Sequence, residues 1–240
     1  MANENNALVL SDNDNGTQSA TWTPIEEITP DQKVLIGNVD PRSGTIQATW
    51  NPSSEGVEFA ASPSAFTLIT NIRNLNVEIP SGIMSIGDDA FHGCTGLTSI
   101  EIPSSVTSIG SAAFTNCTGL TSIEIPSSVT SIGGSAFRGC TGLTSIEIPS
   151  GITSIGYDVF RNCTGLTSIE IPSSVTTIGS GAFSDCTGLT SIEIPSSVTG
   201  IGNQAFYGCT GLTSIVVHKA EGSITDAPWG APNATVTWDG

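Results

Sequence analysis

The sequence repeats itself every 23 residues through more than half of its length. The segment from Glu101 to Ile123 occurs six times with few changes between Glu78 and Ile215, and no insertion interrupts the register. A period of this length is the signature of a solenoid, in which each unit packs only against its neighbours. The landmark columns are proline at 80, 103, 126, 149, 172 and 195, phenylalanine at 91, 114, 137, 160, 183 and 206, and cysteine at 94, 117, 140, 163, 186 and 209.

Within one unit, the run Leu97-x-x-Ile100-x-Ile102 alternates as a short strand does, and the following proline ends it because proline has no ladder donor. We expect a turn at Ile109-Gly110 and one short helical turn over 111–117. The apolar columns are Leu97, Ile100, Ile102, Val106, Ile109, Ala113, Phe114 and Cys117. One unit cannot bury these columns alone, so the sequence predicts a right-handed solenoid with one short parallel β-strand per 23-residue coil.

The pattern Leu-x-x-Ile-x-Ile-Pro-x-x-Val-x-x-Ile-Gly-x-x-Ala-Phe-x-x-Cys resembles the Treponema pallidum-type, or BspA-like, leucine-rich repeat. The likeness covers Glu78 to Ile215. It implies a leucine-rich-repeat arc and, in many relatives, bacterial surface adhesion to host or neighbouring-cell proteins. Similar repeats are also common in protist surface proteins and in phage-associated proteins.

The two ends of the chain do not follow the period. Val34–Val39 and Thr45–Trp50 flank a strong turn signal and predict a hairpin, while Leu68–Ile79 reads as a degenerate first coil. The predicted organisation is an N-terminal β module or attachment arm (1–72), the solenoid (73–215) and a C-terminal β cap (216–240). All four tryptophans lie outside the repeats, at 22, 50, 229 and 238, where we expect them to cover the solenoid ends rather than form a docking surface.

The six cysteines occupy one column of the repeat. Parallel side chains about 4.8 Å apart do not offer the geometry of a disulfide. A metal needs ligands that converge on one point, which a column does not supply. The spacing therefore predicts buried core thiols.

A second column is acidic and forms what we call the Glu ladder: Glu78, Glu101, Glu124, Glu147, Glu170 and Glu193. Three interpretations remain for it: a solvated face copied by duplication, a row that binds divalent cations or a basic partner, or a carboxylate pair for catalysis. The last is disfavoured because the positions are equivalent, whereas acid–base chemistry needs unlike environments. The ladder is thus a weak metal candidate.

The variable positions of the repeat flank Ala-Phe and form what we call the turn stripe: residues 88–89, 92–93, 111–112, 115–116, 134–135, 138–139, 157–158, 161–162, 180–181, 184–185, 203–204 and 207–208. Such positions either drift freely or carry the specificity for a partner. Tyrosine and arginine anchor many interfaces. The candidate partner-binding residues are therefore His92, Arg138, Tyr157, Arg161 and Tyr207.

The charge balance excludes some function classes. With 22 acidic against six basic side chains, the net charge of −16 argues against nucleic acid and anionic membranes as partners. No run approaches the roughly 18 apolar residues of a membrane span. The start of the sequence has no basic region, and its only apolar stretch is Ala7–Leu10. We therefore expect an extracellular or virion-associated protein without a Sec signal peptide, with a cytoplasmic location as the alternative.

No catalytic constellation is visible, since His92 and His218 are the only histidines and no cofactor motif occurs. The sequence predicts a non-enzymatic protein-interaction or adhesion module, displayed on a virion, fibre or secreted assembly and attached through its N-terminal segment. The expected partner is a protein or glycan on a cell surface, or another copy of the chain. The alternative is a purely structural subunit of a filament or lattice built by packing of the repeats.

Overall fold

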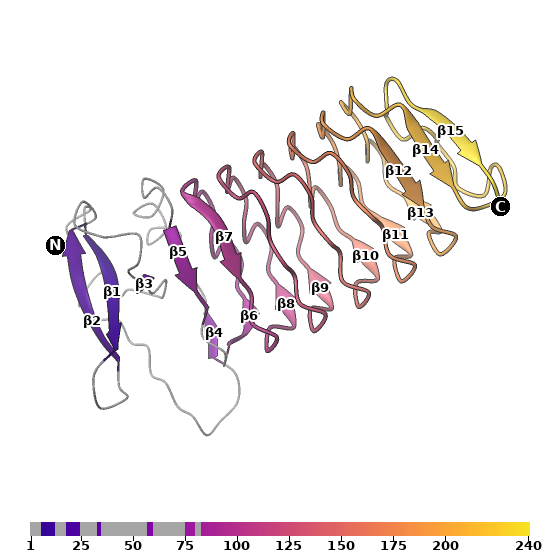
Figure 1. The fold of residues 1–240 in the computed structure, drawn as a ribbon. Helices are drawn as coiled ribbons and strands as arrows, with labels where there is room; N and C mark the ends of the chain where they lie inside the picture. The colour runs from indigo at the N-terminus through magenta and orange to yellow at the C-terminus, as the bar shows by residue number, and fades with distance from the viewer. Residues whose placement is uncertain (1–5, 13–17, 25–32, 35–56, 60–74, 80–82) are drawn as a thin grey trace.

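A computed structural model describes residues 6–12, 18–24, 33–34, 57–59, 75–79 and 83–240. The repeats wind into a parallel β-solenoid, and the N- and C-termini lie at its opposite ends (Figure 1). The described residues contain strands and turns but no helix.

The strands predicted for the coils form a row of parallel strands and single bridges along one side of the solenoid. Its members are β5 (Leu75–Glu78), β7 (Leu97–Glu101), β12 (Ser191–Ile194), β14 (Ser214–Val217) and β15 (Thr235–Trp238). β5 pairs with β7, and β14 pairs with both β12 and β15, always in parallel. In the middle coils, parallel bridges join Glu101 to Glu124 and Glu147 to Glu170. The predicted parallel strand is confirmed.

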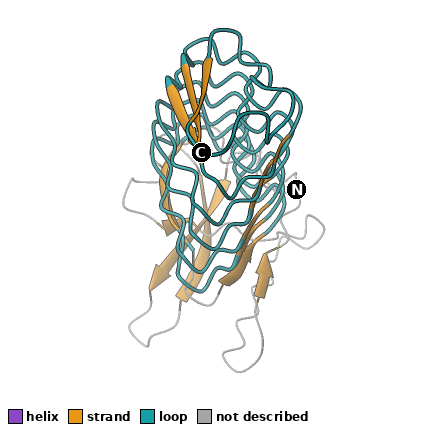
Figure 2. Cartoon of the chain, turned by 90° about the vertical axis from the view of Figure 1, so that its right-hand side faces the viewer, coloured by secondary structure: helices purple, strands orange, loops and turns teal. Residues whose placement is uncertain are grey.

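A second line of short strands, which the sequence analysis missed, runs along another side of the coils (Figure 2). Its members are β4 (Val57–Phe59), β6 (Ile83–Ile86), β8 (Ser108–Ile109), β9 (Ser131–Ile132), β10 (Ser154–Ile155), β11 (Thr177–Ile178) and β13 (Gly200–Ile201). Ile109 thus ends a strand instead of forming the expected turn. Two residues are too few to display the alternation by which strands are recognised in a sequence.

The helical turn predicted over 111–117 is wrong, because the segment forms successive turns instead. Alternate backbone donors point to the next coil: the N–H groups of Ala112, Phe114 and Asn116 donate to carbonyls 22 residues later, over 2.9, 2.7 and 2.7 Å. The N–H groups of Thr115 and Cys117 donate to carbonyls three residues earlier, so they close separate turns. A helix would need the alternate donors within its own segment as well. Hydrogen bonding between coils therefore replaces hydrogen bonding within a helix.

The core consists of the predicted columns, whose side chains are buried throughout the described coils except at Ile79, Ile132 and Ile201, which are partly buried and pack against it. Six phenylalanines, from Phe91 to Phe206, stack along the axis with ring centroids 5.0–5.7 Å apart and interplanar angles of 1–14°. Stacked aromatic pairs add roughly 0.5–1.5 kcal/mol beyond the burial of their area. The Phe column is thus a continuous element that ties each coil to the next.

Trp229 closes this column at the C-terminal end. It follows Phe206 by one repeat length, contacts it edge to face at 6.3 Å, and is 2% exposed. Its indole N–H donates to the Thr225 carbonyl over 2.6 Å, and Trp238 packs against it at 6.4 Å. For these two tryptophans, the expectation of end cover is confirmed.

The N-terminal segment contributes three strands, β1 (Asn6–Asp12), β2 (Gln18–Pro24) and β3 (Lys33–Val34). They form an antiparallel sheet in the order β2-β1-β3. The hairpin predicted around residues 40–44 lies outside the described residues. β3 lies beside β5, so this sheet adjoins the first side of the solenoid.

Candidate functional site

The backbone conformation of the turn stripe limits which residue types can occupy it. The second residue of every stripe pair has a positive φ, between 52° and 72°. These residues form two columns: Asp89, Ala112, Ser135, Asp158, Gly181 and Gln204, and Gly93, Asn116, Gly139, Asn162, Asp185 and Gly208. Glycine, asparagine and aspartate tolerate this region best, and the second column contains nothing else. The second column is therefore restricted in residue type by its backbone, whereas the first column also contains alanine, serine and glutamine.

The other half of the stripe carries the five predicted partner-binding residues. His92, Arg138, Arg161 and Tyr207 belong to one column, with Thr115 and Ser184 as its buried members. Tyr157 belongs to the neighbouring column and, with Tyr207, is among the large hydrophobic side chains that are exposed in the described part of the chain, at 59% and 54%. The structure thus places all five at the surface of the turns.

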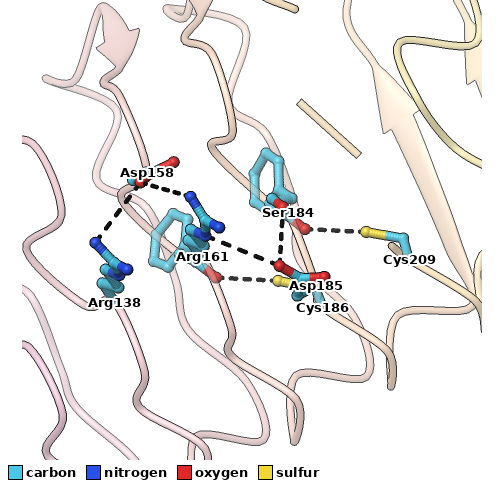
Figure 3. A network of polar contacts seen from close by, with 9 residues as sticks. Arg138, Asp158, Arg161, Ser184, Asp185, Cys186 and Cys209 are labelled. Carbon is cyan, nitrogen blue, oxygen red and sulfur yellow. Dashed lines mark hydrogen bonds and ion pairs between the residues drawn. The ribbon is translucent and has the colours of Figure 1, made fainter. Parts of the chain in front are cut away.

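Three of the five residues lie next to a buried carboxylate, and Figure 3 shows two of them, Arg138 and Arg161. Asp158 directly follows Tyr157 and is 1% exposed. Nη1 of Arg161 donates to its Oδ2 over 3.3 Å, and Nη1 of Arg138 lies 4.0 Å from the same oxygen. Nε of Arg161 lies 3.8 Å from Oδ2 of Asp185. One buried acid therefore positions two arginines from adjacent coils.

The local sequence explains why Asp158 fits there. Its Oδ1 has no hydrogen-bond partner and occupies the space that a Cβ would take at Gly181 in the next coil. Glycine at that position leaves the room that a buried carboxylate needs. Because two cations face Oδ2, the charge of Asp158 is compensated despite its burial. Sequence reasoning missed this acid, although the Asp158–Gly181 pair one repeat apart was visible.

The Glu ladder is exposed wherever side chains are described, from Glu101 to Glu193. Parallel backbone bridges pair Glu101 with Glu124 and Glu147 with Glu170, and Val216 takes the corresponding position after Glu193. Among the described residues, no three His, Cys, Asp or Glu side chains converge as a metal site. The structure gives the ladder no geometry beyond a row.

His218 forms a second cluster that the sequence analysis did not identify. Its Nδ1 lies 2.9 Å from Oδ1 of Asp239, and its Nε2 lies 3.5 Å from Oε2 of Glu193. Hydrogen bonds to Asp239 and then to Glu193 raise the pKa of His218 above its usual 6.5. His218 falls in the column where the repeats have proline, and that change was the available signal. The cluster joins the C-terminal end to the last full repeat.

The cysteines are confirmed as core thiols, since all six are free and buried. From Cys117 onward, each Sγ donates to a phenylalanine carbonyl 26 residues earlier, over 2.9–3.1 Å. Burial raises the pKa of Cys94 to about 12 and that of Cys209 to about 11. Such thiols contain almost no thiolate at neutral pH, and thiolate is the reactive form.

No helix in the described part of the chain is long and apolar enough to cross a membrane. A search of curated proteins found no match to the chain. Among solved structures, a T. pallidum leucine-rich-repeat protein is 34% identical, with a TM-score of 0.56 over 68% of this chain and 72% of that one. A leucine-rich-repeat protein from Bacteroides ovatus is 32% identical, with a TM-score of 0.53 over 70% of this chain and 50% of that one. The present chain therefore spans about half of the B. ovatus protein.

The same assignment comes from the sequence families. The model of the BspA type leucine-rich-repeat region matches residues 62–164 and 153–227, with six copies of the repeat. These matches include every coil in which the Phe column, the core thiols and the turn stripe were described. The chain belongs to the BspA-type leucine-rich-repeat family.

Proposed function

We propose that the chain is a non-enzymatic protein-interaction or adhesion module whose recognition surface is the turn stripe. In this proposal it is displayed on a virion, a fibre or a secreted assembly, and the N-terminal segment serves for attachment. The observation that carries the proposal is the pair Arg138 and Arg161, positioned by the buried Asp158 beside the exposed Tyr157. Proteins of this repeat class bind other proteins.

Physical reasons favour this patch over the rest of the surface. Arg138 and Arg161 remain 47% and 38% exposed, so part of each guanidinium is available to a partner. Because Asp158 restrains them beforehand, less side-chain entropy is lost on binding. Tyrosine and arginine are also enriched among the residues that dominate binding energies. On a chain of net charge −16, two adjacent arginines favour a partner that presents carboxylates, on a protein or on a glycan.

A second candidate function is a structural subunit of a filament or lattice. The observation that favours it is the uniformity of the Glu ladder side, where successive coils present the same exposed residues. A surface that repeats itself suits a repeating partner better than a unique one. In that case the turn stripe is not a recognition site.

The two candidates separate in a binding experiment. The altered chain combines Tyr157→Ser, Arg138→Ser and Tyr207→Ser, and it keeps Arg161 because that residue pairs with the buried Asp158. The control carries Glu124→Gln, Glu147→Gln and Glu170→Gln on the ladder. Both are tested with the unaltered chain on an array of purified cell-surface proteins and glycans, and hits are quantified by biolayer interferometry.

Loss of one interface anchor often costs about 2 kcal/mol, or roughly 30-fold in affinity. We expect at least that loss for the stripe variant and unchanged binding for the ladder variant. Binding that survives in the stripe variant refutes the recognition surface. If only the ladder variant loses binding, the repeated side of the solenoid is the interface instead.

A further inference from the structure

Two sheets of the molecule end in a strand that has a single partner among the described residues. Among the described strands, β15 pairs only with β14, and β2 pairs only with β1. β15 ends the row that begins with β5, and the sheet of β2, β1 and β3 adjoins β5 through β3. β2 and β15 lie at opposite ends of the molecule (Figure 1), and no other described strand pairs with their outer edges. An open edge presents unpaired N–H and C=O groups that can pair with another strand.

The edge of β15 lacks the usual protection. Its residues are Thr-Val-Thr-Trp, which are uncharged, contain no proline and belong to the types that favour strands. Natural edge strands are usually guarded by lysine, proline or a bulge. The side chains of Val236 and Trp238 pack against the core, whereas Thr235 and Thr237 are exposed. The strand is therefore fixed in place while its outer edge stays accessible.

The hydrogen bonds show which donors of β15 are still available. The N–H of Thr235 donates to the carbonyl of Thr213 over 2.9 Å, and the N–H of Asp239 donates to the carbonyl of Val217 over 3.1 Å. Both bonds point toward β14. Successive N–H groups of a strand point to opposite sides. The N–H groups of Val236 and Trp238 consequently face the open edge.

We propose that β15 of one copy pairs with the open edge of β2 in a second copy, so that the chains assemble head to tail. The sequence of β2, Gln18 to Pro24, contains no charged residue either. On a chain of net charge −16, the uncharged edges are where two copies approach with least repulsion. Since the edges differ and lie at opposite ends, the contact is heterologous and extends a line instead of closing a dimer. The turn stripe takes no part in this contact and stays accessible along the line.

The test uses a chain that can join a line but cannot extend it. Val236→Pro removes one outward donor of β15 and leaves the bonds from Thr235 and Asp239 to β14 in place. Proline is tolerated on an edge strand when its missing N–H would face outward. Sedimentation velocity of the full chain is measured from micromolar to near-millimolar concentration, with circular dichroism melting to verify the fold of each variant.

We expect the weight-average mass of the unaltered chain to rise steadily with concentration. Val236→Pro alone should remain a monomer. An equimolar mixture should contain shorter assemblies than the unaltered chain at the same total concentration, because each Val236→Pro copy ends the line that it joins. If that variant fails to fold, Thr237→Lys supplies an edge charge instead, with Thr144→Lys on a central coil as its control.

Four results overturn the proposal. The first is an unaltered chain that stays monomeric at every concentration. The second is a mass that levels off at a dimer, which indicates that two β15 edges pair with each other. The third is assembly that both edge variants leave unchanged, which places the contact elsewhere. The fourth is an unaltered chain that is monomeric and binds a protein on the array, when Val236→Pro abolishes that binding. The edge of β15 then binds another protein and not a second copy.

Discussion

The glycine of each Thr-Gly-Leu motif offers a direct test of how tightly the coils are stacked. A Cβ at Gly165 would lie 2.5 Å from the backbone carbonyl oxygen of Thr141 in the preceding coil, and 3.2 Å from that of Leu143. The same close approach to a threonine carbonyl recurs at Gly119, Gly142, Gly188 and Gly211. Because the obstacle is backbone, rotation of a side chain cannot relieve it. Gly165→Ala must therefore separate two coils.

The size of the effect follows from that geometry. Ordinary contact needs at least 3.4 Å, so the coils must part locally by about 0.9 Å, or relax elsewhere by the same amount. Nearby, the N–H of Gly139 donates to the backbone carbonyl of Arg161 over 2.8 Å. A shift of that size would lengthen this bond beyond the range of a hydrogen bond. Overpacking costs about 1–3 kcal/mol, and a weakened hydrogen bond costs about 1 kcal/mol more. We expect Gly165→Ala to lower the free energy of unfolding by about 2–4 kcal/mol.

Gly200 provides the matched control. An added Cβ at Gly200 meets nothing within 4 Å, and its φ lies outside the left-handed region. Alanine there should be neutral or should stabilise by roughly 0.4–1 kcal/mol through the unfolded chain. The assay is urea unfolding followed by far-UV circular dichroism, with a check that the slope with urea is unchanged. Two variants within about 1 kcal/mol of each other would refute the packing argument.

Two further predictions concern titratable groups. We expect the six thiols to resist Ellman's reagent in the native chain and to react together after denaturation, because burial raises the pKa of Cys94 to about 12 and that of Cys209 to about 11; rapid labelling of the native chain would contradict this. The raised pKa of His218 means that the folded state holds a proton more strongly, so this stabilisation is full below pH 6.5 and is lost as the pH rises through the raised value. When melting temperatures are measured at increasing pH, the loss of stability assigned to His218 should be absent from His218→Gln. An identical loss in the variant would show that another group is responsible.

The repeat made the core residues predictable, but the backbone conformation of the turns was not predicted. Columns such as Phe114 and Cys117 follow from the sequence, because a strict period and a shared core admit few arrangements. The apolar spacing of 111–117 suits a helical turn, whereas alternate N–H groups of this segment donate to the next coil. The restriction of residues 93, 116, 139, 162, 185 and 208 to glycine, asparagine and aspartate was the signal for positive φ.

The residues of the candidate sites could in part be predicted from the sequence, but the contacts between them could not. Arg138 and Arg161 stand out in a chain with six basic residues. Asp158 restrains them because its carboxylate is buried, and the burial of Asp158 could not be predicted from a column whose other members are mostly at the surface. The His218 cluster joins residues 21 and 25 positions away, one of them in a segment without the repeat. Contacts of that kind follow from the way the last coil ends and not from the period.

Hydrogen bonds that run from coil to coil have a mechanical consequence. Alternate N–H groups of the turns, and the strands on both sides of the solenoid, bond one coil to the next along the length of the molecule. Tension applied between the two ends therefore pulls on these bonds lengthwise, and coils should peel from an end one at a time instead of rupturing together. Each released coil frees 23 residues, or about 80 Å of extended chain. Under load, such a tether lengthens in equal steps and absorbs work that a rigid rod would transmit to its attachment.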